Sequence, residues 1–168
     1  GLPRGTKATT LVLASSFSGN TEETLSAYDA AKEERRPLVG IAAGGALQLR
    51  CTADGVPFVK IPADPPTMQP RSATGYTVGI LARLLTNANL ASDHATDDIA
   101  ALGGALHNFM ETARARGDAL VPAIKGETPV IYASDRYRTV ARILKIKSNE
   151  NAKTPAFWNV FPELNHNE

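Results

Sequence analysis

The sequence predicts an α/β protein in which helices cover a parallel sheet. Short apolar segments rich in β-formers alternate with amphipathic helical patterns, and loops rich in Ser and Gly join them. The apolar segments lack polar alternation, which is typical of strands buried on both faces. With 168 residues, of which 43% are hydrophobic and 21% charged, the chain can form one domain and part of a second.

The first third of the chain carries the clearest alternation. Its expected strands are residues 10–14, 37–42 and 57–61, and its expected helices are residues 21–35 and 46–53. Strands that alternate with helices in such short succession predict right-handed crossovers and a parallel sheet. Asn20 is expected to cap the first helix, because Glu23 follows three residues later as in a capping box.

The rest of the chain is less regular. The prolines of residues 62–70 predict a loop. Further elements are expected in this order: a helix over 72–89, a helix over 96–116 that ends at Gly117, a strand over 129–133, a helix over 137–148, and an irregular tail over 149–168. A boundary is expected near residues 118–127. The segment after it would hold one strand and one helix, too little for a core of its own.

Composition excludes several classes of function. Lys and Arg total 18 and Asp and Glu total 17, without a basic cluster, so we expect no nucleic-acid partner. The apolar runs are shorter than the roughly 20 residues of a membrane span, so no membrane partner is expected. A lone Cys51 favours a reducing compartment, hence the cytoplasm, and is expected to be buried and inert. The three histidines lack metal-ligand spacing, so we expect no metal and no cofactor.

The first candidate site is the loop between the first strand and the first helix. Ser16, Ser18 and Thr21 supply hydroxyls, and Gly19 lets a ligand approach the backbone. Open α/β sheets bind ligands at the carboxyl ends of their strands, and a helix N-terminus favours a phosphate. The alternative is a helix cap on a Ser-rich turn.

Three further residues are candidates for catalysis. Arg71 follows the proline-rich loop, where a guanidinium could stabilise a developing oxyanion; the alternative is a solvated surface arginine. Glu150 and His166 lie in the polar tail and are the ordinary residue types of proton transfer near neutral pH. Their alternative is a polar terminus that lies on the surface.

Four motifs carry a family resemblance. Residues 16–24, Ser-Phe-Ser-Gly-Asn-Thr-Glu-Glu-Thr, resemble the phosphosugar-binding loop of the sugar isomerase (SIS) fold. Residues 70–76, 149–153 and 162–168 resemble, in the same order, segments of the bifunctional phosphoglucose/phosphomannose isomerases. The resemblance implies an SIS-type three-layer α/β/α sandwich with a parallel sheet, followed by the start of a second SIS domain.

The resemblance also implies residue roles. The residues that match the sites holding the sugar phosphate are Ser16, Ser18 and Thr21. Arg71 matches the arginine that stabilises the enediolate, and Glu150 matches the base that moves a proton between C1 and C2. His166 matches the histidine that opens the sugar ring from the neighbouring subunit of a homodimer. Aldose–ketose isomerisation, which the resemblance implies, needs no metal or organic cofactor, and we expect none.

The implied function is the interconversion of glucose 6-phosphate or mannose 6-phosphate with fructose 6-phosphate, a step of carbohydrate metabolism. The alternatives are a non-catalytic SIS module that binds a phosphosugar, and an isomerase of another ketose phosphate. Family members begin with a further strand and continue beyond the histidine. We therefore expect an incomplete fragment, with residues 1–120 as a first SIS domain lacking its first strand and residues 121–168 as the beginning of a second.

Overall fold

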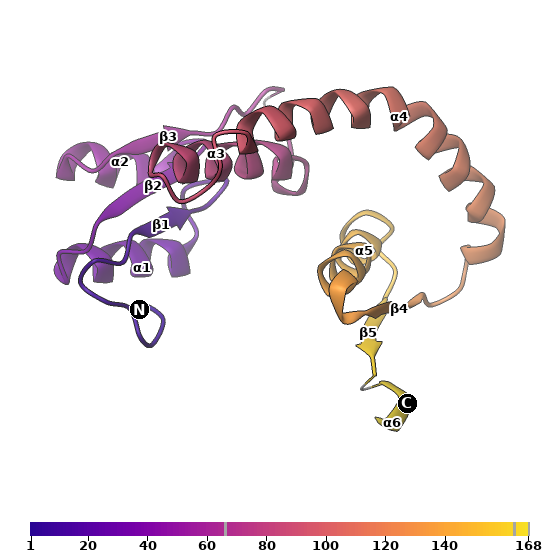
Figure 1. Ribbon diagram of the computed structural model, residues 1–168. Coiled ribbons are helices and arrows are strands. Elements are labelled where there is room, and N and C mark those ends of the chain that lie inside the picture. Colours follow the sequence, from indigo (N-terminus) through magenta and orange to yellow (C-terminus); the bar gives the residue numbers. More distant parts are fainter. Residues whose placement is uncertain (66, 163, 168) are drawn as a thin grey trace. The chain divides into compact units, whose positions relative to one another are not determined.

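A computed structural model describes residues 1–65, 67–162 and 164–167, and the chain forms two compact units, Gly1–Gly104 and Ala105–Glu168 (Figure 1). Helices alternate with parallel strands in both units, which confirms the predicted α/β class. The units divide within the long helix α4 (Ala95–Ile124). The SIS domain boundary after residue 120 stays a prediction. Pro66 of the proline-rich loop, and Glu163 and Glu168 of the last motif, lie outside the described residues.

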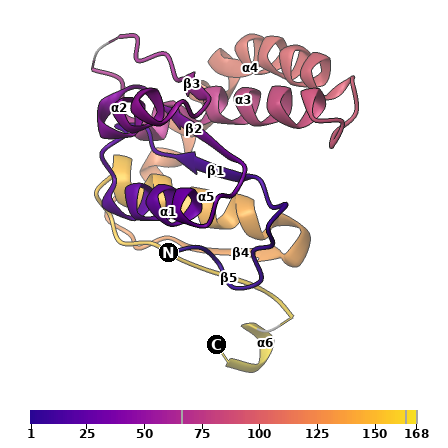
Figure 2. The same ribbon diagram turned by 90° about the vertical axis from the view of Figure 1, so that its left-hand side faces the viewer.

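The first unit is built on a three-stranded parallel sheet (Figure 2). The strands lie in the order β1 (Val12–Ser15), β2 (Leu38–Ala42) and β3 (Phe58–Lys60). Two crossover helices join them, α1 (Glu22–Glu33) and α2 (Gly45–Asp54). All five elements match the sequence prediction to within three residues. Each apolar strand pairs in register with the next, as Val12 does with Leu38.

The sheet of the first unit is covered on both faces, which gives three layers. On one face Ala14, Leu38 and Ala42 pack with Tyr28 of α1 and Leu47 of α2. The other face buries Ile41 and Ile61 against a 3-10 turn (Pro70–Ser72) and helix α3 (Thr74–Asn87). Because side chains alternate along a strand, both faces must be apolar, and this explains the strands' continuous apolar runs.

Gly40 lets α2 pack closely on the centre of the sheet. A Cβ at this position would lie 2.4 Å from Cys51 Sγ and 3.2 Å from Phe58 Cδ2. Cys51 itself is fully buried, as expected, and burial raises the pKa of its thiol. The absence of a side chain at Gly40 therefore sets how near the crossover helix approaches β2.

The second unit contains a strand that the sequence did not predict. Strand β4 (Val130–Ser134) pairs in parallel with β5 (Phe157–Phe161), and α5 (Arg138–Asn151) contacts both. The prediction of an irregular tail was therefore wrong over β5, since Pro155 and Pro162 leave room for a five-residue strand between them. A short helix, α6 (Leu164–Asn167), follows.

The predicted end of the long helix was also wrong. Helix α4 continues through Gly117 to Ile124. Gly117 is not among the positive-φ glycines, whereas a glycine that ends a helix usually adopts the left-handed conformation. A glycine without that conformation weakens a helix by about 1 kcal/mol relative to alanine, but it does not end it.

The sheet face of the second unit opposite α5 is apolar and exposed. Val130, Tyr132, Phe157 and Phe161 are all more than 40% exposed, and the Tyr132 and Phe161 rings lie 6.4 Å apart. A pair of strands is at most marginally stable alone. An exposed apolar face of this kind is typical of a surface that packs against further protein. Within the described residues, none of the helices combines the length and apolarity that a membrane span requires.

A buried tyrosine ties the ends of α1 and α2 together. The Tyr28 hydroxyl donates to Asp54 Oδ2 at 2.9 Å, and Lys32 Nζ forms an ion pair with Oδ1 of the same carboxylate. The hydrogen bond from Lys32, followed by that from Tyr28, holds the pKa of Asp54 below its ordinary value. Burial, together with the hydrogen bond to Asp54, raises the pKa of Tyr28.

This group predicts an acid-sensitive component of stability. A carboxylate whose pKa is lowered by folding stabilises the fold above its unfolded pKa of about 3.9, and the contribution is lost as pH falls through the lower folded value. Asp54→Asn should therefore lower the melting temperature at neutral pH, and the difference from wild type should shrink below about pH 4. Melting curves from pH 2 to pH 7 test this, with the exposed Asp93→Asn as control. A difference that stays constant over this range would contradict the assignment.

Candidate functional site

The candidate phosphate loop, residues 16–21, lies at the carboxyl end of β1 and leads into α1. The Ser16 N–H donates to Ile41 O at 3.0 Å and so continues the pairing of β1 with β2 by one residue. Thr24 Oγ1 of α1 donates to Ser15 O at 3.2 Å. The loop is therefore anchored at both ends, in the place where open α/β sheets bind ligands.

Hydroxyl groups organise the inside of this loop. Ser16 is 7% exposed, and its Oγ accepts the Gly19 N–H at 3.1 Å. Ser16 Oγ and Thr21 Oγ1 are 2.7 Å apart and share a hydrogen bond. Ser16 is thus the inner anchor of the loop, and it fixes the position of Thr21 directly in front of α1.

Ser18 and Thr21 are the exposed hydroxyl residues of the loop. Ser18 Oγ accepts the Asn20 N–H at 3.2 Å, so its own proton remains available to donate outward. The structure therefore brings the three predicted hydroxyls together beside the start of a helix. Such an arrangement can supply hydroxyl donors, backbone amides and the positive end of a helix dipole to an anion.

The loop touches the turn between β2 and α2 backbone to backbone. A Cβ at Gly19, whose φ is +72°, would lie only 1.8 Å from the Gly44 carbonyl oxygen. Gly45, with φ +73°, is equally constrained, because a Cβ there would lie 2.3 Å from Ser18 O. Two hydrogen bonds join the same segments, Ala43 N to Phe17 O at 2.8 Å and Leu47 N to Gly19 O at 2.9 Å.

Asn20 does not cap α1, so the prediction of a capping box was wrong. Thr21 is the residue that precedes the helix, and Asn20 Oδ1 accepts the Ala46 N–H of α2 at 2.9 Å. The sequence analysis missed this contact because its capping signal was local, whereas the partner lies 26 residues away. The adjacent Gly44 and Gly45 were the available sign that another backbone approaches here.

Arg71 lies in the first unit on the 3-10 turn before α3 and is half-buried. Ala73, two residues later, is 2% exposed and belongs to the core cluster that Phe17 of the loop packs against. The turn and the loop therefore share a core cluster on one face of the sheet. The turn that carries Arg71 therefore packs on the same face of the sheet as Phe17 of the loop.

Glu150 and His166 belong to the second unit, whereas the loop hydroxyls and Arg71 belong to the first. Glu150 is exposed near the end of α5, and His166 is exposed on α6. The segment after Glu150 turns sharply: Lys153 has φ +54°, and Asn149 Nδ2 donates to Thr154 O at 2.9 Å. This bond fixes the residue that precedes Glu150.

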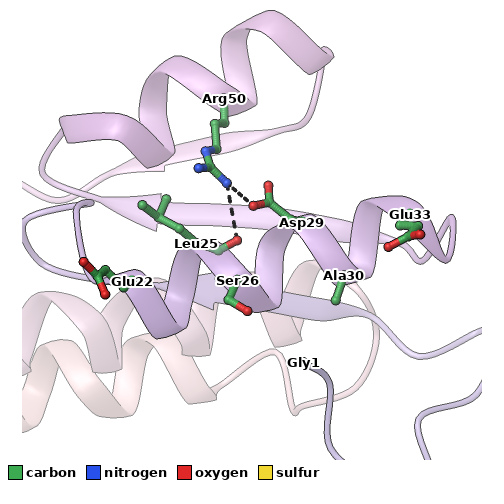
Figure 3. A pocket seen from close by; sticks show the side chains of 8 residues that line it. All are labelled: Gly1, Glu22, Leu25, Ser26, Asp29, Ala30, Glu33 and Arg50. Carbon is green, nitrogen blue, oxygen red and sulfur yellow. Dashed lines mark hydrogen bonds and ion pairs between the residues drawn. The ribbon is translucent and has the colours of Figure 1, made fainter.

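A hollow of about 470 Å³ runs along α1 but does not include the loop hydroxyls (Figure 3). Arg50 of α2 reaches across it to pair with Asp29 and to donate to Leu25 O. The other charged side chains that line it are Glu22 and Glu33. Three carboxylates against one arginine disfavour an anion, so this hollow does not suit a phosphate.

A second hollow of about 580 Å³ lies between β3 and α3. Val59, Ile80 and Leu84 give it apolar walls, and Lys60 and Arg83 add positive charge. Among residues 1–65, 67–162 and 164–167, no three His, Cys, Asp or Glu side chains are grouped so that they could hold a metal ion.

Fold and loop together define an α/β protein whose first strand-to-helix loop can receive an anion, and comparison with known proteins shows what the chain is similar to. Residues 114–168 match the family described as "Bacterial phospho-glucose isomerase C-terminal SIS domain". Over 99% of its length the chain is 35% identical to the bifunctional phosphoglucose/phosphomannose isomerase of Caldicellulosiruptor bescii, and it covers 50% of that protein. The homologues of this chain over nearly its whole length therefore include bifunctional phosphoglucose/phosphomannose isomerases, and its residues 114–168 match an SIS domain, as the resemblance implied.

Two more relatives show the range of named activities among the proteins that the chain is similar to. The bifunctional phosphoglucose/phosphomannose isomerase of Thermoplasma acidophilum is 37% identical over 99% of this chain. The D-glucosamine-6-phosphate 4-epimerase of Sulfolobus acidocaldarius is 34% identical over 95% of it. The chain spans about half the length of the curated relatives it matches, since it covers 50% of each of these proteins.

The contact between the two loops predicts a large effect of a side chain at Gly19. A left-handed residue costs about 1–2 kcal/mol when alanine replaces glycine, and overpacking adds about 1–3 kcal/mol. Gly55→Ala is a matched control, because Gly55 has φ +65° but a Cβ added there would meet no neighbouring atom within 4 Å. Gly19→Ala should therefore destabilise more than Gly55→Ala in urea unfolding. Equal losses would contradict the close approach of Gly44.

Proposed function

We propose that this chain forms part of an aldose–ketose isomerase that interconverts glucose 6-phosphate and mannose 6-phosphate with fructose 6-phosphate in the cytoplasm. The observation that carries the proposal is the anchored loop that presents Ser18 and Thr21 in front of α1. The names of two relatives support the same reaction, and their similarity extends over 99% of the chain.

The loop would hold the substrate's phosphate. Ser18 and Thr21 offer exposed hydroxyls, and Ser16 adds the third hydroxyl from inside the loop. The first-turn amides of α1 complete the set of donors. The phosphate is remote from the reacting carbons. The energy of binding it can therefore be used to hold those carbons in the orientation that the reaction needs.

His166 would open the sugar ring by protonating the ring oxygen O5. The C1–O5 bond breaks, and the C1 hydroxyl passes its proton to solvent water to leave the aldehyde. In this proposal the histidine acts on a substrate bound to the neighbouring subunit of a homodimer. Its exposure on α6 is consistent with such a role. The exposed apolar face of β4 and β5 supports association with further protein, because Val130, Tyr132 and Phe161 lie uncovered on it.

Glu150 and Arg71 would carry out the isomerisation. The Glu150 carboxylate takes the proton from C2 of the open-chain aldose, the bonding pair forms the C1–C2 double bond, and negative charge moves to O1. Arg71 stabilises this enediolate. The carboxyl then returns the proton to C1, and the O2 proton passes to O1 to leave the ketose. Because C2 becomes planar, glucose and mannose 6-phosphates share one intermediate.

Two alternatives have their own support. A module that only binds phosphosugars would need the loop but not Glu150 or His166. The similarity to the D-glucosamine-6-phosphate 4-epimerase, 34% identical, makes epimerisation at C4 of an amino sugar phosphate the second candidate. All three functions use a phosphosugar, so the assay must separate reaction from binding.

Glu150→Gln tests the isomerase directly. The amide keeps the size of the side chain but cannot take a proton, so kcat should fall by about 10²–10⁴-fold while fructose 6-phosphate binds as in wild type. Glu127→Gln is the control, since Glu127 is an exposed glutamate before β4. A coupled assay should follow glucose and mannose 6-phosphates separately, in this chain and in the longest natural protein that contains it.

The other outcomes separate the alternatives. Unchanged turnover in Glu150→Gln would overturn the role of Glu150. A wild-type protein without turnover, whose melting temperature rises with fructose 6-phosphate, would favour the binding module. Conversion of glucosamine 6-phosphate to its C4 epimer would favour the epimerase.

A further inference from the structure

The local sequence predicts that Asn20 caps α1, yet its side chain is used elsewhere. It stands directly before Thr21, the residue that precedes the helix. Its Oδ1 accepts the Ala46 N–H in the first turn of α2 at 2.9 Å. Asn20 therefore caps the next crossover helix through a tertiary contact.

Helix α1 is left without a side-chain cap from its preceding residue. The Thr21 hydroxyl is engaged with Ser16 Oγ at 2.7 Å, and within the described part of the chain it makes no capping hydrogen bond. The first four amides of a helix have no partner inside the helix. The first-turn amides of α1 follow directly after the loop that carries Ser18 and Thr21.

The loop holds the Asn20 side chain toward α2 by packing as well as by hydrogen bonding. A Cβ at Gly45 would lie 2.7 Å from Asn20 Oδ1 and 3.0 Å from its Cγ, so the amide sits against bare backbone. The Asn20 N–H donates to Ser18 Oγ at 3.2 Å. Asn20 thus connects the α2 N-terminus to an exposed hydroxyl of the loop.

We propose that Asn20 is a positioning residue for the substrate's phosphate. By capping α2 it fixes the loop that carries Ser18 and Thr21, and it leaves the α1 N-terminus open to the anion. This inference rests on the proposed phosphosugar site. It also explains why a neutral amide suits the position. An aspartate would cap α2 equally well, but it would add a negative charge beside the phosphate.

Asn20→Ala tests the positioning role, and Tyr28→Phe is the control, because each variant loses one tertiary hydrogen bond. The substitution should lower the melting temperature and weaken binding of fructose 6-phosphate and of inorganic phosphate by about five- to tenfold. Tyr28→Phe, which removes the hydrogen bond to Asp54, should also lower the melting temperature but leave both affinities unchanged. Where the protein turns over, Asn20→Ala should raise KM and leave kcat unchanged. Equal affinities in Asn20→Ala and wild type would overturn the inference.

Asn20→Asp keeps the test decisive if the alanine variant does not fold. The carboxylate retains an acceptor for the Ala46 N–H, so the melting temperature should match or exceed that of wild type. Phosphate and fructose 6-phosphate should bind at least about tenfold more weakly because of like-charge repulsion. Undiminished binding would show that Asn20 is remote from the phosphate. A wild-type protein that binds neither ligand would overturn both the proposed function and this inference.

Discussion

The contact between the two strand-to-helix loops is the constraint on which the candidate site depends. Gly19 and Gly45 approach carbonyl oxygens of the opposite loop so closely that a methyl group at either would overlap them. Both have positive φ angles, which glycine adopts without strain. Hydrogen bonds from Ala43 and Leu47 then join the loops in one register. The loop hydroxyls are thus positioned by the backbone of a neighbouring crossover.

This constraint supports preorganisation of an anion site. A free Ser-rich loop would lose conformational entropy on binding a phosphate, about 1–2 kcal/mol for each residue that becomes fixed. Here Ser16 and Thr21 already share a hydrogen bond, and Asn20 is bonded to α2. The conformational entropy of these residues is therefore lost when the protein folds and not when the anion binds, which raises the affinity for the anion.

Periodicity predicted the first unit well, because its strands are apolar on both faces and its helices lie between them. It failed where tertiary contacts decide the structure. The local pattern predicted that Asn20 caps α1. In the structure its Oδ1 instead accepts a hydrogen bond from the N–H of Ala46 in α2, which lies 26 residues away. The five residues of β5 were too few for the sequence pattern to reveal a strand, and the pairing of β5 with β4 is non-local. Sequence resemblance named Glu150 and His166, and the geometry of the second unit adds only that both are exposed.

The central claim is that the loop between β1 and α1 receives the phosphate. The most direct measurement is a titration of the ¹⁵N-labelled chain with fructose 6-phosphate, followed by amide chemical shifts. The account predicts saturable shifts, with one common dissociation constant, at Ser18 and at Glu22, Glu23 and Thr24 of the first turn of α1. Saturable shifts confined to Lys60 and Arg83, which line the hollow between β3 and α3, would contradict it, as would the absence of any saturable shift.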